Sequence, residues 1–144
     1  MDQSSLLDTG ATAATPRLFA SDKILSCLIG EDAILIGMAL ESYLEDQGFT
    51  CEMVCSSAEA QKWLDENTPS VAVLDYQLKD GPCTTLAALL RARGVPFLIY
   101  SGYPADEACP ELRGAPWINK PVDRETLLHA VSSLAASPVR PGSL

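Results

Sequence analysis

The sequence predicts a doubly wound α/β protein in which helices cover both faces of a five-stranded parallel sheet. Apolar runs of strand length alternate along the chain with longer segments of helical period, which is typical of repeated βα units. The chain has 144 residues and a hydrophobic content of 47%, which suits one globular domain with a sizeable core. We expect this domain to span residues 22–136, between a flexible leader over residues 1–21 and a flexible tail over residues 137–144.

Five strands and four clear helices are expected from the hydrophobic pattern. The strands are expected over residues 23–29, 50–55, 71–74, 96–100 and 115–118, and the helices over residues 32–47, 57–67, 84–93 and 123–136. Ser56 or Ser57 is expected to cap the second helix, and Asp123 the last one. One apolar face of the first helix holds Leu35, Met38 or Ala39, and Tyr43.

The segment between the fourth and fifth strands has little capacity for a helix. It contains Pro104, Pro110 and Gly114, so a helix of at most a turn or two is expected around residues 106–113. We therefore predict that the fourth helix of the fold is short or irregular.

The charge of the chain argues against two classes of partner. The formal net charge is −9 and the ten basic residues are scattered, whereas nucleic acids and anionic membrane surfaces are bound by clustered Lys and Arg. No stretch is long enough to span a bilayer, and the first residues lack the basic start and apolar run of a secretory signal. We expect a cytoplasmic protein that binds neither nucleic acid nor membrane.

The cysteines and the single histidine are expected to be structural. The five cysteines include no Cys-x-x-Cys pair, which favours free thiols in a reducing compartment. Cys51 and Cys55 are four apart in an expected strand and are interpreted as small buried side chains on one face. Because His129 is the single histidine, a site that needs two imidazoles is excluded, and His129 is expected on the surface of the last helix.

Polar residues follow four of the expected strands directly. Glu31 and Asp32 follow the first strand, Asp75 the third, Ser101 the fourth, and Lys120 the fifth. Ligands of parallel α/β sheets bind outside the carboxyl ends of the strands, so these side chains are expected to converge on one small pocket. Crowded carboxylates repel one another unless a cation relieves the repulsion, and an all-oxygen ligand set favours Mg²⁺.

Over roughly residues 23–136, these motifs and their order resemble the receiver domains of two-component signalling. The resemblance implies a flavodoxin-like (βα)5 fold with strand order 2-1-3-4-5. It also implies an acidic pair at Glu31 and Asp32, a phosphoacceptor at Asp75, and a cis peptide after Lys120 in Asn-Lys-Pro. The metal ligands it implies are Glu31, Asp32, Asp75 and the backbone carbonyl of Gln77.

The mechanism implied by the resemblance is Mg²⁺-dependent phosphoryl transfer. Asp75 would accept the phosphoryl group of a phosphohistidine on a sensor histidine kinase or phosphotransfer protein, with Lys120 and Ser101 assisting. Hydrolysis would then reset the protein, which makes it a self-modifying phosphoacceptor rather than a conventional enzyme. Ser101 and Trp117 are the expected switch residues, although Trp117 is bulkier than the usual Tyr or Phe and packing in the core is an equally good interpretation.

Several alternatives stay open or are disfavoured at this point. Each carboxylate alone is more simply a cap or a solvated loop residue, and Asp32 precedes a helix that it could cap. A haloacid-dehalogenase-like phosphatase is disfavoured, because it needs a second acid at the position of Gln77. A flavodoxin-like electron carrier is disfavoured as well, because the acidic loop at Glu31 would repel the phosphate of its flavin. A degenerate receiver that only binds protein remains as an alternative.

The expected output also has two forms. A stand-alone receiver either docks on a downstream protein target when phosphorylated or serves as a phosphate sink or shuttle in a phosphorelay, as a monomer or weak dimer. The stretch from Ser101 to Lys120 is about one helical turn shorter than in most receivers. Residues 96–103 are similar to a subgroup paired with HWE-type histidine kinases, from which Tyr100 and Pro104 depart.

Overall fold

The computed structural model describes residues 24–105 and 109–136. The expected leader over residues 1–21 and tail over residues 137–144 lie outside these residues. Within the described part of the chain, no helix combines the length and the hydropathy that crossing a membrane requires.

Five parallel strands form one sheet in the expected order. The strands are β1 (Ser26–Gly30), β2 (Thr50–Val54), β3 (Val71–Leu74), β6 (Phe97–Ser101) and β7 (Trp117–Asn119), and their order across the sheet is β2-β1-β3-β6-β7. Counted without the short hairpin β4–β5, this is the order 2-1-3-4-5. The prediction of a doubly wound, flavodoxin-like sheet is therefore confirmed.

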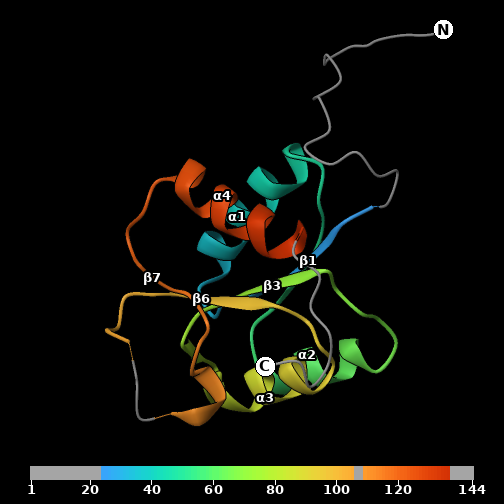
Figure 1. Cartoon of the computed structure of the whole chain (residues 1–144), viewed down its shortest axis with the longest axis vertical. Coiled ribbons are helices and arrows are strands. Elements are labelled where there is room, and N and C mark those ends of the chain that lie inside the picture. The colour runs from blue at the N-terminus through green and yellow to red at the C-terminus, as the bar shows by residue number, and fades with distance from the viewer. Residues whose placement is uncertain (1–23, 106–108, 137–144) are drawn as a thin grey trace, which may run out of the picture.

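Helices cover both faces of the sheet, as Figure 1 shows. The helices α1 (Ile34–Asp46) and α4 (Arg124–Ala136) lie on one face, and α2 (Ser57–Leu64) and α3 (Thr84–Ala92) lie on the other. Each face has its own buried cluster, because successive residues of a strand point to opposite sides. Leu28, Leu74 and Ile99 belong to the α2–α3 side, whereas Ile29, Val73 and Leu98 belong to the α1–α4 side.

The apolar face assigned to α1 is wrong in part. Leu35 and Met38 are exposed, with 81% and 52% of their surface accessible, while Gly37 and Leu44 are the buried residues of this helix. The Met53 side chain of β2 packs against Gly37, since a Cβ built at Gly37 would lie 2.2 Å from the Met53 sulfur. The helix therefore faces the sheet through Gly37 and Leu44, and several of its large apolar side chains point to solvent.

The cysteine assignments are confirmed in one respect and wrong in another. All five cysteines are free thiols. Cys27 and Cys83 are buried, but Cys51 and Cys55 are only half-buried. Cys51 lies on β2 and Cys55 directly after it, and among the described residues β2 is the edge strand of the sheet. Burial and the nearby carboxylates Glu45 and Glu41 raise the pKa of the Cys51 thiol to about 12, so it stays protonated.

A short hairpin follows β3 and is tied to α2. The strands β4 (Gln77–Leu78) and β5 (Gly81–Pro82) pair antiparallel across the expected turn, where Gly81 has a φ of 122°. The carboxylate of Asp80, in this turn, accepts hydrogen bonds from the N–H groups of Ser57 and Ala58 at the start of α2. The loop after Asp75 is thereby fixed to a helix of the α2–α3 layer.

The described part of the segment between β6 and β7 contains one turn of 3-10 helix, η1 (Pro110–Leu112), in place of a full helix. The prediction of a short or irregular fourth helix is thus confirmed. Arg91 on α3 holds this segment: its Nε donates to the Glu111 carbonyl at 3.1 Å, and a second guanidinium nitrogen donates to the Arg113 carbonyl. The guanidinium also lies 5.4 Å from the centre of the Phe97 ring.

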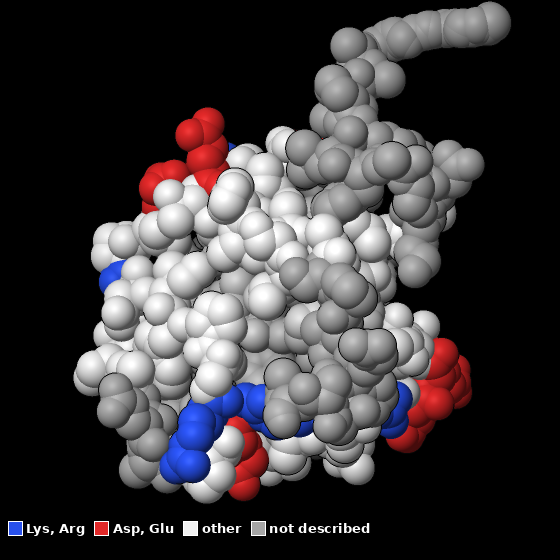
Figure 2. Space-filling model, in the orientation of Figure 1, with Lys and Arg blue, Asp and Glu red and all other residues white. Residues whose placement is uncertain are grey.

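The charged side chains do not form an extended basic surface on the face that Figure 2 shows. Lys and Arg side chains gather at the lower edge of this view, over the α3 side of the molecule, and acidic side chains lie close beside them. Most of this face is uncharged. The exposed position expected for His129 is confirmed.

The start of α2 provides a matched pair of substitutions for stability. The Ser56 side chain caps the helix by accepting from the Glu59 N–H at 3.0 Å, whereas the adjacent Ser57 hydroxyl is buried without a hydrogen-bond partner among the described residues. We expect Ser56→Ala to lower the free energy of unfolding by about 1 kcal/mol. Ser57→Ala should leave it unchanged or raise it, because it removes an unsatisfied buried hydroxyl. Urea unfolding of both variants checks this, and equal losses would contradict the assignment of Ser56 as the cap.

Candidate functional site

Three carboxylates meet at the carboxyl edge of the sheet. Glu31 and Asp32 follow β1 and Asp75 follows β3, and one carboxylate oxygen from each lies within 4.8 Å of the other two. The sheet fixes both backbones at this point, since the Asp75 N–H donates to the Gly30 carbonyl at 2.8 Å and the Glu31 N–H to the Val54 carbonyl at 2.9 Å. The convergence expected from strand-end positions is therefore present.

Lys120 reaches into this acidic cluster from the end of β7. Its Nζ lies 2.9 Å from Glu31 Oε1 and 3.4 Å from Asp75 Oδ2, and 5.2 Å from the centre of the Tyr100 ring. The Lys120 N–H donates to the Ser101 carbonyl at 2.8 Å, and the peptide bond between Lys120 and Pro121 is cis, as expected. Lys120 thus partly neutralises two of the three carboxylates.

Burial and mutual charge perturb the ionisation of this cluster. Burial raises the pKa of the Glu31 carboxyl above its ordinary value, and hydrogen bonds from Lys120 and from the Ala33 N–H offset only part of this effect. Burial acts to lower the pKa of Lys120, but the hydrogen bond and charge of Glu31, together with Asp75, outweigh it and raise that pKa. Lys120 is therefore a permanent cation in the site.

The simpler interpretation of Asp32 as a helix cap is not supported. The N-cap position of α1 is Ala33, and no side chain among the described residues caps it there. The carboxylate near this end is Glu31, whose Oε2 accepts from the Ala33 N–H at 3.1 Å. Asp32 is the most exposed of the three acids and is left to bind a ligand or solvent.

The donor set of the site fits Mg²⁺. Its members are hard carboxylate oxygens clustered at an open edge, where waters and phosphate oxygens can complete an octahedral shell. The Lys120 ammonium already pairs with two of these carboxylates, as expected where like charges are crowded together. Gln77 begins β4 two residues after Asp75, and its carbonyl stays a predicted further ligand.

Ser101 and Trp117, the two expected switch residues, both form hydrogen bonds with the backbone of Tyr103. Ser101 is fully buried, and its Oγ accepts from the Tyr103 N–H at 3.1 Å. Trp117 is half-buried, and its Nε1–H donates to the Tyr103 carbonyl at 2.9 Å. Its ring centre lies 5.6 Å from that of Tyr76, which in turn lies 5.8 Å from that of Tyr103. Trp117 is therefore part of a surface aromatic cluster of Tyr76, Tyr103 and Trp117.

Sequence reasoning assigned no structural role to two members of this region. Tyr76 directly follows Asp75, and Asn119 directly precedes Lys120 and donates from Nδ2 to the Tyr103 carbonyl at 2.9 Å. The sequence contained one indication of their importance, namely that they are adjacent to Asp75 and Lys120. Side-chain direction was the missing information, because strand spacing alone does not say which loop carbonyl a side chain reaches.

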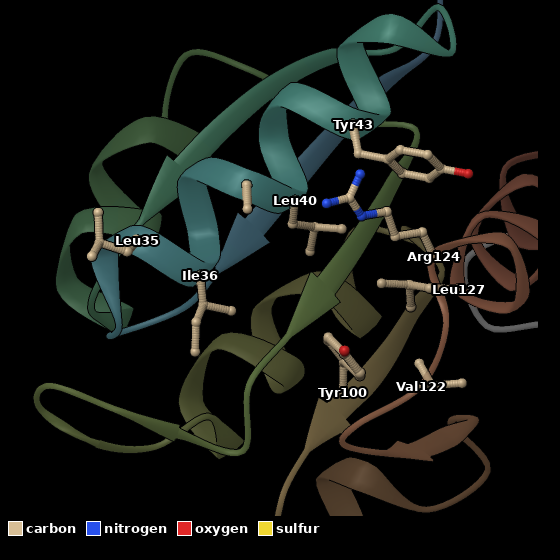
Figure 3. Close-up of a pocket in the computed structure, with 9 residues that line it drawn as sticks. Leu35, Ile36, Leu40, Tyr43, Tyr100, Val122, Arg124 and Leu127 are labelled. Carbon is tan, nitrogen blue, oxygen red and sulfur yellow. The ribbon is translucent and has the colours of Figure 1, made fainter.

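An apolar groove adjoins the site on the α1–α4 side (Figure 3). It has a volume of about 360 Å³ and is lined by Leu35, Ile36, Ala39, Leu40, Tyr43, Tyr100, Val122, Arg124 and Leu127. Tyr100 connects the groove to the site, since its ring also lies under the Lys120 ammonium. The guanidinium of Arg124 extends toward Tyr43 and lies 5.5 Å from the centre of its ring.

Comparison with known proteins agrees with this geometry. The family model of the response regulator receiver domain matches residues 27–132. The structure of a response regulator receiver protein from Sinorhizobium medicae WSM419 is 25% identical, with a TM-score of 0.72 over 81% of this chain and 98% of that one. A CheY-like receiver domain protein from Methanospirillum hungatei JF-1 is 22% identical, with a TM-score of 0.71 over 78% of this chain and 94% of that one.

A putative response regulator from Chloroflexus aurantiacus J-10-fl is similar to the same extent, with 23% identity and a TM-score of 0.71 over 80% of this chain and the whole of that one. The comparison with curated protein sequences gives no match. The family model covers most of the domain, including every residue of the acidic cluster and Lys120. The chain belongs to the response regulator receiver domain family.

Proposed function

We propose that this receiver accepts a phosphoryl group on Asp75, in a Mg²⁺-dependent reaction, from the phosphohistidine of a sensor histidine kinase or phosphotransfer protein. The observation that supports this most directly is the position of the Asp75 carboxylate, inside an acidic cluster and 3.4 Å from the Lys120 ammonium. A carboxylate needs such charge neutralisation to approach an anionic phosphoryl group. The protein is a cytoplasmic signalling component in this proposal.

The proposed reaction is an in-line displacement. An oxygen of Asp75 attacks phosphorus, the new P–O bond forms as the P–N bond to imidazole breaks, and the neutral imidazole leaves after taking up a proton. Lys120 and the Ser101 hydroxyl stabilise the phosphoryl oxygens, and Glu31, Asp32, Asp75 and the Gln77 carbonyl would hold Mg²⁺, which supplies further charge neutralisation when bound. Attack of water on the same phosphorus releases phosphate and restores the Asp75 carboxylate.

Competing activities fit the site less well. A phosphatase of the haloacid-dehalogenase-like class needs an acid to protonate the leaving group, and the side chain two residues after Asp75 is the amide of Gln77, which donates to the Leu78 carbonyl. In a flavodoxin-like electron carrier, the flavin phosphate would be repelled by the carboxylates of Glu31 and Asp32. A degenerate receiver would not need the acidic cluster, Ser101 and Lys120 together.

Two outputs are compatible with this activity. Phosphorylation either switches docking on a downstream protein or feeds a phosphate sink or shuttle. A target whose binding strengthens with the phosphoryl mimic beryllofluoride supports docking, whereas rapid transfer and rapid hydrolysis without such a target support a sink.

The first prediction concerns the acceptor itself. Acetyl phosphate with Mg²⁺ should add one phosphoryl group to the wild type and none to Asp75→Asn, because an amide is not nucleophilic enough to displace the leaving group. Intact-mass spectrometry measures the adduct, and Asp65→Asn, which changes an exposed acid at the C-terminal end of α2, is the matched control. An unmodified wild type, or an equal adduct on Asp75→Asn, would refute the proposed acceptor.

The second prediction separates Lys120 from the metal ligands. The Lys120 ammonium and Mg²⁺ both bind Glu31 and Asp75 in this proposal, so Lys120→Met should retain Mg²⁺ binding and tighten it by removing a competing cation. Phosphorylation by acetyl phosphate should slow by roughly 100-fold, because a charge that stabilises the transferring group is lost. Calorimetric titration with Mg²⁺ measures the first effect, and Lys62→Met on α2 is the matched control. Weaker Mg²⁺ binding in Lys120→Met would show that the lysine supports the metal site instead.

The phosphodonor is proposed to contact the exposed apolar side chains of α1. Ile34, Leu35, Ile36 and Met38 are each about half or more exposed, and α1 begins three residues after Glu31. The groove lined by Leu35 and Ile36 continues to Tyr100 beneath Lys120. A protein that brings a phosphohistidine to Asp75 must approach this edge, so an apolar surface beside its histidine would bury these side chains.

This contact predicts a difference between protein and small-molecule donors. Leu35→Asp should slow transfer from the cognate kinase by at least roughly tenfold, since it places a charge in an apolar interface, and should leave the acetyl phosphate rate unchanged. Ile24→Asp is the matched control, because Ile24 is 69% exposed and precedes β1 at the opposite edge of the sheet. Equal kinase rates for Leu35→Asp and the wild type would exclude the α1 surface.

A further inference from the structure

The backbone of Tyr103 is held at both of its polar groups by residues next to the phosphoacceptor site. Its N–H donates to Ser101 Oγ at 3.1 Å, and its carbonyl accepts from Trp117 Nε1 and from Asn119 Nδ2, each at 2.9 Å. A carbonyl oxygen has two lone pairs, so the two donors together complete its hydrogen bonding. Tyr103 lies in an exposed turn after β6, which has no regular backbone pairing of its own.

The hydrogen bond at Ser101 determines how its hydroxyl can act. A serine oxygen has two lone pairs and one hydrogen, so accepting from the Tyr103 N–H still leaves the hydrogen to donate. The oxygen is fully buried, and the Ser101 carbonyl accepts from the Lys120 N–H, so its backbone is already fixed by the sheet. The remaining freedom is rotation of the side chain, and the Tyr103 N–H limits this rotation.

We propose that Asn119 and Trp117 are positioning residues that act through the Tyr103 peptide to hold the Ser101 hydroxyl in place for the phosphoryl group. Both residues belong to β7 and are two apart, so their side chains lie on the same side of the sheet and reach the same carbonyl. The ring of Tyr76, the residue after Asp75, packs against the rings of Tyr103 and Trp117. This role rests on the proposed phosphoryl transfer to Asp75, to which Asn119 and Trp117 would contribute indirectly.

The same geometry gives Trp117 a fixed orientation. Rotating the indole away would break the bond to Tyr103 and the ring contact with Tyr76 at once. Trp117 therefore stabilises the turn. The chemical shift of its indole N–H depends on the hydrogen bond to the Tyr103 carbonyl.

The test compares phosphorylation rates of single and double variants. Asn119→Ala removes one donor, and Trp117→Phe removes the other while keeping a ring against Tyr76. Each should slow modification by acetyl phosphate by about two- to tenfold, the range for one lost hydrogen bond. The double variant should be as slow as Ser101→Ala. Asn67→Ala is the matched control, because the Asn67 Nδ2 also donates to a backbone carbonyl at 2.9 Å, that of Trp63 on α2.

The decisive comparison uses a Ser101→Ala background. If Asn119 and Trp117 act through the Ser101 hydroxyl, their removal changes nothing further once that hydroxyl is gone, and Mg²⁺ affinity stays at the wild-type value throughout. Wild-type rates in the single and double variants would overturn the positioning role. The same fold-loss with or without Ser101, or a loss of Mg²⁺ affinity, would overturn it as well, since both would indicate a general disturbance of the site.

A second measurement does not depend on phosphoryl transfer. The protein has two tryptophans, so its indole N–H groups give two signals in a ¹H–¹⁵N spectrum, and Trp63 serves as the internal reference. Asn119→Ala should shift the Trp117 signal alone, because the two donors share one acceptor. An unshifted Trp117 signal would refute the shared carbonyl. The wild-type adduct on Asp75 tests the proposed function separately, so failure of either idea can be recognised by itself.

Discussion

The mutual repulsion of three carboxylates is the constraint on which the site depends. Parallel strands end at one edge, and the register of β1 and β3 places Glu31, Asp32 and Asp75 within 4.8 Å of one another. Such a cluster is unfavourable without positive charge, which Lys120 supplies from the other side of β6. The fold therefore has to bring the end of β7 to the ends of β1 and β3. The hydrogen bond from the Lys120 N–H to the Ser101 carbonyl, 2.8 Å long, joins the end of β7 to that of β6.

The parts of the fold that the sequence predicts best are those in which local pattern and environment agree. Val71–Leu74 is apolar throughout and fully buried, so its boundaries are the same in the sequence and in the structure. The convergence of Glu31, Asp32, Asp75 and Lys120 was also predictable, because these residues lie just after strands and the carboxyl ends of parallel strands share one edge of the sheet. The prediction of a reduced fourth helix followed from prolines and a glycine, whose backbone effects are local.

The errors arise where a tertiary contact overrides the local pattern. The face of α1 was assigned from large apolar side chains, but one of its buried residues is Gly37, which packs against the Met53 side chain of β2 and contributes nothing to an apolar pattern. Leu35 and Met38 consequently point outward. The role of Asn119 was missed for a related reason. Its partner is a main-chain carbonyl in an irregular turn, and sequence periodicity carries no information about such a partner.

The alternation of side chains along β7 separates the two tasks of the site. Trp117 and Asn119 reach the Tyr103 turn, and Trp117 packs against the α2–α3 cluster. Ile118, between them, packs with the α1–α4 cluster, to which Tyr100 also belongs. Lys120, the next residue on that alternation, lies over Tyr100 and reaches the carboxylates. Ile118 and Lys120 therefore lie on the side of the groove and α1, where a donor would approach. Trp117 and Asn119, which hold the Tyr103 turn, lie on the opposite side. Because alternate residues of β7 face opposite sides of the sheet, the hydrogen bonds that hold the Tyr103 turn lie on the side away from the groove and α1.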